Sequence, residues 1–211
     1  AGMSDWPILA DGQAWDTQGV NTFTTDGRIV IPGGTVHTKG NWSTATYTAT
    51  TDLTGIALEI GGNSALGTWL MDVGVIYPGA GSQQILIPDL LFSAPGSNRH
   101  ASSYYLPVRI PTGSVIYYRS QGSSTDGFSV FTHGLASGSN AQEGFSGCRA
   151  FGITSAVSGG TQIAPGATAH TKSVYFTVGS VTTEPISAIV VSIGTRGASA
   201  LVAARVLFDI T

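Results

Sequence analysis

Charged residues are scarce in this sequence. Asp, Glu, Lys and Arg make up 10% of the 211 residues, whereas an average globular domain carries about 25%. Only two of the cationic residues are lysines, Lys39 and Lys172, and the seven arginines form no run. Affinity for a phosphate backbone rises with the number of cationic contacts. The composition therefore argues against nucleic acid as a partner.

Cysteine and long apolar runs are also missing. Cys148 is the single cysteine, so the 211 residues offer neither an intrachain disulfide nor paired thiolates for zinc. We expect it to be a small buried filler rather than a nucleophile. No stretch approaches the roughly 18 apolar residues of a membrane span. Residues 1–5 lack the basic-then-apolar pattern of an export signal. We expect a soluble chain with no membrane partner.

The residues that are present favour a folded β-rich protein. Hydrophobic residues reach 42%, the formal net charge is −3, and aromatic residues are spread along the chain. This is enough apolar material for a sizeable core, and it differs from the composition of disordered chains. The surface must then be covered largely by Ser, Thr, Asn, Gln and Gly. A surface with so few charges suggests contact with other protein subunits, because each buried charge would need a partner.

An internal repeat is the strongest signal in the sequence. Residues 31–39 (Ile-Pro-Gly-Gly-Thr-Val-His-Thr-Lys) reappear as residues 164–172 (Ala-Pro-Gly-Ala-Thr-Ala-His-Thr-Lys), an offset of 133 (170 − 37). The offset persists without gaps as far as Val73 and Val206. In both copies Pro-Gly followed by Thr predicts a turn that leads into a strand. The repeat therefore predicts two related β units.

Apolar residues at period two predict the strands of these units. Ile56, Leu58 and Ile60 share one face of the first copy, and residues 187–193 repeat the pattern in the second. Further short runs bounded by Pro, Gly and Ser bring the total to about eight strands, the number of a jelly roll. Besides residues 54–60, the predicted runs are 28–31, an aromatic strand after the first turn, 69–75, 84–88, 104–111, 115–119 and 128–131.

These strands predict an all-β fold, a jelly-roll-like β-sandwich in which the repeat forms a second, partial β unit. We assign residues 1–19 to an N-terminal arm, 20–133 to the sandwich and 134–211 to the second unit. Within the 211 residues the second copy reaches only its third strand, predicted over 201–210. A partial sheet leaves unpaired edges that must be covered. We therefore expect packing onto the first sandwich or completion by another subunit.

Four segments of the sequence resemble β-sandwich virion proteins of tailed bacteriophages. The segments are residues 32–42, 69–75, 85–90 and 106–119, and the resemblance spans roughly residues 30 to 119. It implies a place on the surface of the phage particle, as a capsid decoration or cement protein or as a fibre part. It also implies a homotrimer whose partners are its own copies and the major capsid protein or other virion proteins. Sandwich folds carry many functions, so function has to be argued from the site.

The sequence contains no pattern typical of an active site. His37 and His170 follow the two turns without a second His, Cys, Asp or Glu in either motif, so we assign them to turn stabilisation and not to metal. Asp72 is expected on a solvated strand face, like Glu59, and Asp89 is expected in a turn. There is neither a nucleophile elbow nor a phosphate-binding loop. We predict no enzyme activity, no catalytic residue, no cofactor and no metal.

Aromatic residues suggest two kinds of binding. Trp6 and Trp15 are expected to anchor the N-terminal arm on the sandwich or on a neighbouring subunit, because large aromatics are favoured at interfaces. Host glycans are a second possible partner, which would make the chain a tail-fibre or receptor-binding module. The candidate residues for a glycan site are Tyr104, Tyr105, Tyr117, Tyr118, Asn98 and Arg99. Neighbours in a strand point to opposite faces, so one tyrosine of each pair is expected in the core.

Overall fold

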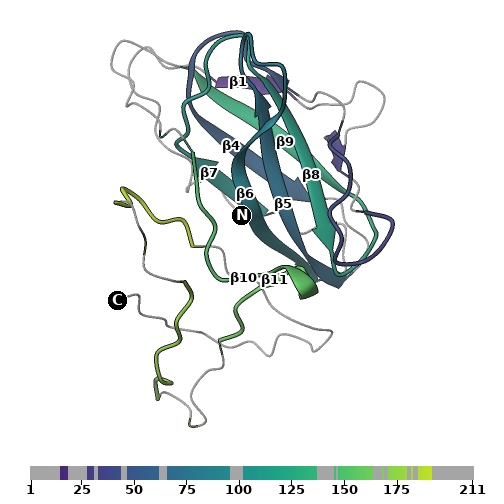
Figure 1. Cartoon of the computed structure of the whole chain (residues 1–211), viewed down its shortest axis with the longest axis vertical. Coiled ribbons are helices and arrows are strands. Elements are labelled where there is room, and N and C mark those ends of the chain that lie inside the picture. The colour runs from purple at the N-terminus through teal and green to yellow at the C-terminus, as the bar shows by residue number, and fades with distance from the viewer. Residues whose placement is uncertain are drawn as a thin grey trace.

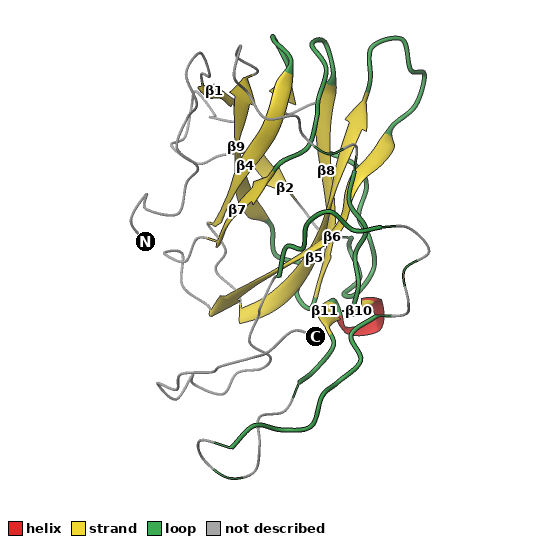
Figure 2. Ribbon diagram, turned by 90° about the vertical axis from the view of Figure 1, so that its left-hand side faces the viewer, coloured by secondary structure: helices red, strands yellow, loops and turns green. Residues whose placement is uncertain are grey.

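The protein is a sandwich of two antiparallel β-sheets (Figures 1 and 2). The computed structural model describes residues 15–18, 28–30, 33–43, 47–61, 66–95, 102–136, 145, 147–163, 168, 171–179, 182 and 185–191. The β4 sheet contains β1 (Trp15–Gln18), β2 (Arg28–Val30), β4 (Leu53–Gly61), β7 (Ser102–Leu106) and β9 (Phe128–Ala136). The β5 sheet contains β3 (Tyr47–Thr48), β5 (Leu66–Ile76), β6 (Gln84–Pro95) and β8 (Val115–Gly122). The ribbon of β10 (Ile153–Thr154) and β11 (Gly159–Gly160) brackets the 3₁₀ turn η2 (Ser155–Val157).

The strand order is that of a jelly roll. The pairs β2 with β9, β3 with β8, β4 with β7 and β5 with β6 are all antiparallel and nested one inside the next. An eight-stranded ribbon that folds double on itself gives this nesting. The two sheets then read β1-β9-β4-β7 and β3-β8-β5-β6, with β2 also on β9. The predicted all-β, jelly-roll-like sandwich is confirmed.

The core lies between the two sheets, as the period-two pattern predicts. Ile56 and Leu58 of β4 are fully buried, and Ile60 is nearly so. The inward positions of β5 face them, and the ring of Trp69 stacks on Phe92 with 5.3 Å between the ring centroids. Burial of this many large side chains supplies the main stabilisation of the fold, at roughly 25 cal/mol per Å² of apolar area removed from water.

The predicted runs correspond to strands β2 to β9, with different ends. β6 runs on past residue 88 to Pro95 through a bulge, and the run over 104–111 becomes β7 followed by isolated bridges at Val108 and Ile110. The sequence patterns do not predict β1 as a strand. It pairs with β9 from Trp15, opposite Leu135, so the backbone of this part of the arm is docked on the chain's own sandwich. Trp6 lies outside the described residues.

Part of the outer edge of β6 is covered by later residues of the chain. The amide of Cys148 donates a hydrogen bond to the carbonyl of Leu86 at 3.1 Å. Cys148 is exposed, so the prediction of a buried filler is wrong. Cys148 lies at a sheet edge and not between the two sheets, so its side chain does not reach the core. No helix in the described part of the chain is long and apolar enough to cross a membrane.

The described residues beyond 160 lie beside the sandwich as extended chain (Figure 1). All of them, at 161–163, 168, 171–179, 182 and 185–191, are exposed. The strand expected over 187–193 is absent from its described part, residues 187–191. A period-two pattern becomes a strand only where partner strands pair with it and cover its face. The third repeat strand, expected over 201–210, and His170 lie outside the described residues.

Candidate functional site

A segment that we call the strap, residues 33–43, extends the β5 sheet along β8. β3 pairs with the first residues of β8, and the strap continues this pairing toward its other end. The amides of Ser43, Gly40 and His37 donate to successive alternate carbonyls of β8, at Tyr118, Ser120 and Gly122, over 2.7 to 2.8 Å. The first copy of the repeat thus begins as an extra edge segment of the sheet.

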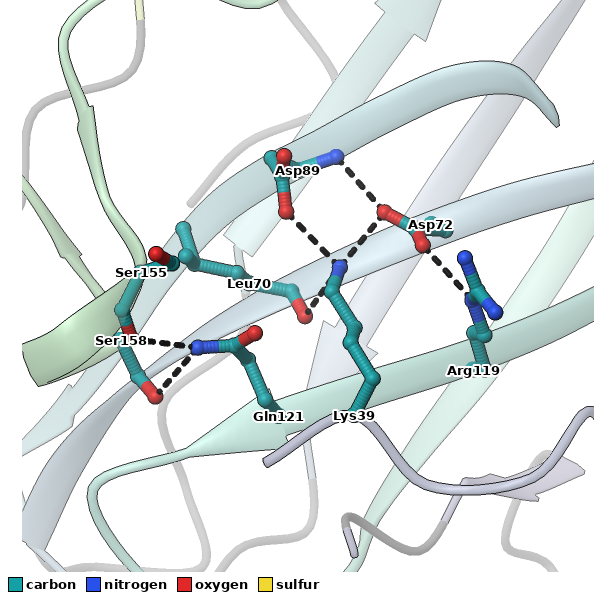
Figure 3. A network of polar contacts seen from close by, with 8 residues as sticks. All are labelled: Lys39, Leu70, Asp72, Asp89, Arg119, Gln121, Ser155 and Ser158. Carbon is teal, nitrogen blue, oxygen red and sulfur yellow. Dashed lines mark hydrogen bonds and ion pairs between the residues drawn. The ribbon is translucent and has the colours of Figure 1, made fainter. Parts of the chain in front are cut away.

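A four-residue ion cluster, which we call the clip, fastens the strap across the outer face of this sheet (Figure 3). Nζ of Lys39 lies 2.6 Å from Oδ1 of Asp72 on β5 and 2.8 Å from Oδ1 of Asp89 on β6. Nε of Arg119 on β8 donates to Oδ2 of Asp72 at 2.8 Å. The clip therefore joins the strap to three neighbouring strands with balanced charge.

Asp72 is the centre of the clip and is only 2% exposed. Burial raises the pKa of its carboxyl group, but the hydrogen bonds from Lys39, the Asp89 amide and Arg119 outweigh burial, and the pKa lies below its ordinary value. The expectation that Asp72 lies on a solvated strand face is wrong. Its position is outward, as the alternation requires, but the strap lysine covers it.

Asp89 belongs to a bulge of β6 rather than to a turn after the strand. Met71 pairs with Leu90 and Val73 with Ile87, so Asp72 faces two residues of β6. Asp89 has a φ of 50°, a left-handed conformation that Asp tolerates better than most residues. The bulge brings its amide 2.9 Å from Oδ1 of Asp72. β-bulges commonly re-aim a side chain in this way.

The ring of Trp42 lies on the same outer face of the β5 sheet as the clip. The guanidinium carbon of Arg119 lies 4.4 Å from the centroid of the Trp42 ring, a cation–π contact. The ring lies directly on Gly74 of β5, where a Cβ atom would come within 2.7 Å of it. Only glycine permits this close approach.

We expect Gly74→Ala to displace the Trp42 ring and to lower the free energy of unfolding by about 1 kcal/mol, since the half-buried ring can move outward. Urea denaturation followed by tryptophan fluorescence measures the change. Gly34→Ala is the matched control, because a Cβ atom at Gly34 meets nothing within 4 Å. Equal stability of the two variants would contradict the contact.

His37 fastens the strap to η2. Its Nδ1 lies 3.0 Å from Oγ of Ser158, a fully buried residue that follows η2. Nε2 of Gln121 donates to the same Oγ at 3.1 Å and to the carbonyl of Ser155 at 2.6 Å (Figure 3). The turn around His37 is closed by the backbone, with Thr38 N donating to Thr35 O at 3.3 Å. His37 therefore contacts a segment 121 residues away rather than bonding across its own turn.

These contacts fasten the chain to itself. Both carboxylate oxygens of Asp72 accept hydrogen bonds, Oδ1 from Lys39 and Oδ2 from Arg119. Among the described residues no group of three or more His, Cys, Asp or Glu side chains could hold a metal ion.

The tyrosines proposed for a glycan site do not gather in one place. Tyr118 is fully buried, and Tyr104 packs against the core and donates to the carbonyl of Leu91. The alternation thus places Tyr118 in the core and the half-buried Tyr104 against it. Their neighbours Tyr105 and Tyr117 belong to different sheets and lie on opposite outer faces of the sandwich. Asn98 and Arg99 lie outside the described residues.

No family model, no curated protein and no solved structure matches this chain.

Proposed function

We propose that this chain is a virion structural protein, a capsid decoration or cement protein that binds a phage head through protein–protein contacts. One observation carries the proposal: large apolar side chains are exposed on the chain that follows the sandwich. Soluble monomers rarely expose contiguous apolar patches of more than a few hundred Å², and larger ones mark interaction sites. The exposed residues are Phe145, Phe151, Ile163, Val174, Tyr175, Phe176, Val178, Ile186, Ile189, Val190 and Val191.

The design of the sandwich supports the same function. Its ion cluster and its half-buried histidine contact tie the strap, β5, β6, β8 and η2 together, which favours a rigid body over a moving catalytic cleft. Its low content of charged residues suits surfaces that pack against other subunits, because an unpaired charge at an interface is costly to desolvate. A receptor-binding module for glycans has weaker support, because Tyr105 and Tyr117 lie on opposite faces.

The proposal predicts that the chain bands with phage particles in a density gradient of lysate from the host that produces them. Mass spectrometry of the fractions should also detect it on heads that lack tails, because a cement protein binds the shell itself. Detection only on tails would overturn the head assignment in favour of a fibre part. Absence from heads and tails would overturn the virion role.

A further inference from the structure

A side-chain hydrogen bond between His37 and Ser158 joins the strap to the chain after η2. Both residues have a left-handed backbone, with φ of 61° and 50°. Residues other than glycine adopt this conformation at a cost, and they keep it where their surroundings hold them. η2 itself has no buried residue, whereas Ser158 directly after it is fully buried. The attachment of η2 therefore depends on the polar contacts around Ser158.

The direction of each hydrogen bond at Ser158 follows from the groups around it. The carbonyl of Ser155 can only accept, so the Gln121 atom 2.6 Å from it is the amide nitrogen, Nε2 (Figure 3). The same nitrogen donates its second hydrogen to Oγ of Ser158 at 3.1 Å. Oγ then donates its own proton to Nδ1 of His37, 3.0 Å away. This arrangement satisfies every group when the imidazole is neutral and carries its proton on Nε2.

Protonation of the imidazole breaks this arrangement. Both ring nitrogens of a charged histidine are donors, so Nδ1 can no longer accept the proton of Ser158. Oγ of Ser158 then meets two donors, His37 and Gln121, and its own proton has no acceptor among the described residues. A buried donor that loses its partner costs more than the hydrogen bond contributed. The contact therefore favours the neutral imidazole.

His37 is the residue of this contact whose type changes charge near neutral pH. Histidine ordinarily gains a charge between pH 8 and pH 5. Residues 153–160 and residues 120–122 of β8 carry no ionisable side chain. Hydrogen bonds hold the pKa of the Asp72 carboxyl below its ordinary 3.8, so this centre of the clip keeps its charge at pH 5. The charged side chains of the strap, β5, β6 and β8 are the four of the clip, Lys39, Asp72, Asp89 and Arg119.

We propose that His37 is a pH-sensitive latch, which holds η2 on the strap when its imidazole is neutral and releases η2 when the imidazole is protonated. The described chain beyond residue 160 follows η2 and is exposed (Figure 1), so acid loosens the attachment of this chain to the sandwich. The clip holds the strap itself on the sheet, and the strap stays in place. The latch lies within a single chain and is independent of the virion role.

The test is hydrogen exchange of single amides of the full chain, measured by NMR at pH 8 and at pH 5 and expressed as protection factors. The reporters are the amides of Ser158 and Thr161, whose hydrogen bonds close η2 and the ribbon around it. We expect their protection to fall by about tenfold at pH 5, the effect of one buried hydrogen bond lost. The amide of Gly40, which bonds the strap to β8, is the internal control and should keep its protection.

Two variants separate the titration of His37 from its packing. In His37→Asn, Oδ1 of the amide takes the place of Nδ1 as acceptor but does not titrate, and asparagine tolerates the left-handed backbone. We expect this variant to protect both reporters equally at pH 8 and pH 5. In Ser158→Ala the hydroxyl is absent, so the reporters should be about tenfold less protected at pH 8 and should lose nothing further at pH 5.

Three results would overturn the latch. The first is equal protection of the reporters at both pH values in the parent. The second is a loss at pH 5 that persists in His37→Asn, because another group would then be titrating. The third is a loss that Gly40 shares, because the sandwich as a whole would then be loosening.

Discussion

Replacement of Ile56 by alanine is expected to lower the free energy of unfolding by about 3 to 4 kcal/mol, because it removes a fully buried side chain and leaves a cavity. The same replacement at the matching repeat position, Ile189→Ala, should change it by less than about 0.5 kcal/mol, as is usual for an exposed site. A comparison of the two variants separates the effect of burial from the effect of the substitution itself, since the residue, the replacement and the place in the repeat are the same.

The measurement is urea denaturation followed by tryptophan fluorescence. The slope of the free energy with urea concentration should be the same for both variants, because each exposes the same sandwich on unfolding. A comparable loss at Ile189 would mean that the second copy is packed within a single chain. A small loss at Ile56 would contradict the register of β4.

The sequence predicts the sandwich well because its main determinants are local. Ile56, Leu58 and Ile60 alternate with smaller or polar residues, and Pro, Gly and Ser mark the ends of each run, so the strands and their inward faces can be recognised without knowledge of their partners. The number of strands then leaves few compact arrangements, of which the jelly roll is one.

The clip could not be predicted in the same way because its parts come together only through tertiary register. Asp72 meets Arg119 because β5 and β8 pair at that position, and Lys39 arrives with the strap from 33 residues earlier. A bulge in β6, at Pro88 and Asp89, supplies the second carboxylate. One signal was present: in a chain with two lysines, both occupy the same repeat position, 39 and 172. Such a placement indicates a role for the lysine in the repeat unit.

The second copy shows the limit of periodicity. Residues 187–191 carry the alternation that forms β4 in the first copy, yet the structure has no strand there. The pattern states which face of a strand would be buried, but a strand also requires neighbours to accept its hydrogen bonds. The sequence alone predicts that the second β unit has an unpaired edge. The structure adds which side chains of this segment are exposed.

Replacement of Asp72 by asparagine is expected to lower the free energy of unfolding by about 2 to 3 kcal/mol at pH 7. Removal of one partner of a buried ion pair costs about 3 to 5 kcal/mol when the other charge stays buried. The cost here is smaller because Lys39 and Arg119, 23% and 28% exposed, can regain water. The midpoint of thermal unfolding should fall by about 5 to 10 °C. Asp52→Asn is the control, because Asp52 accepts hydrogen bonds from Thr112 in an exposed turn.

Acid should remove this difference between parent and variant. The folded-state pKa of Asp72 lies below its ordinary value of 3.8, so the clip contributes fully above that pH. Its contribution is lost as the pH falls from 3.8 through the folded-state pKa, because the native carboxylate must then take up a proton. The asparagine side chain of the variant cannot titrate, and the two unfolding curves should therefore converge on acidification. A gap that stays constant down to acid denaturation would mean that packing around residue 72, rather than the charge of its carboxylate, holds the strap on the sheet.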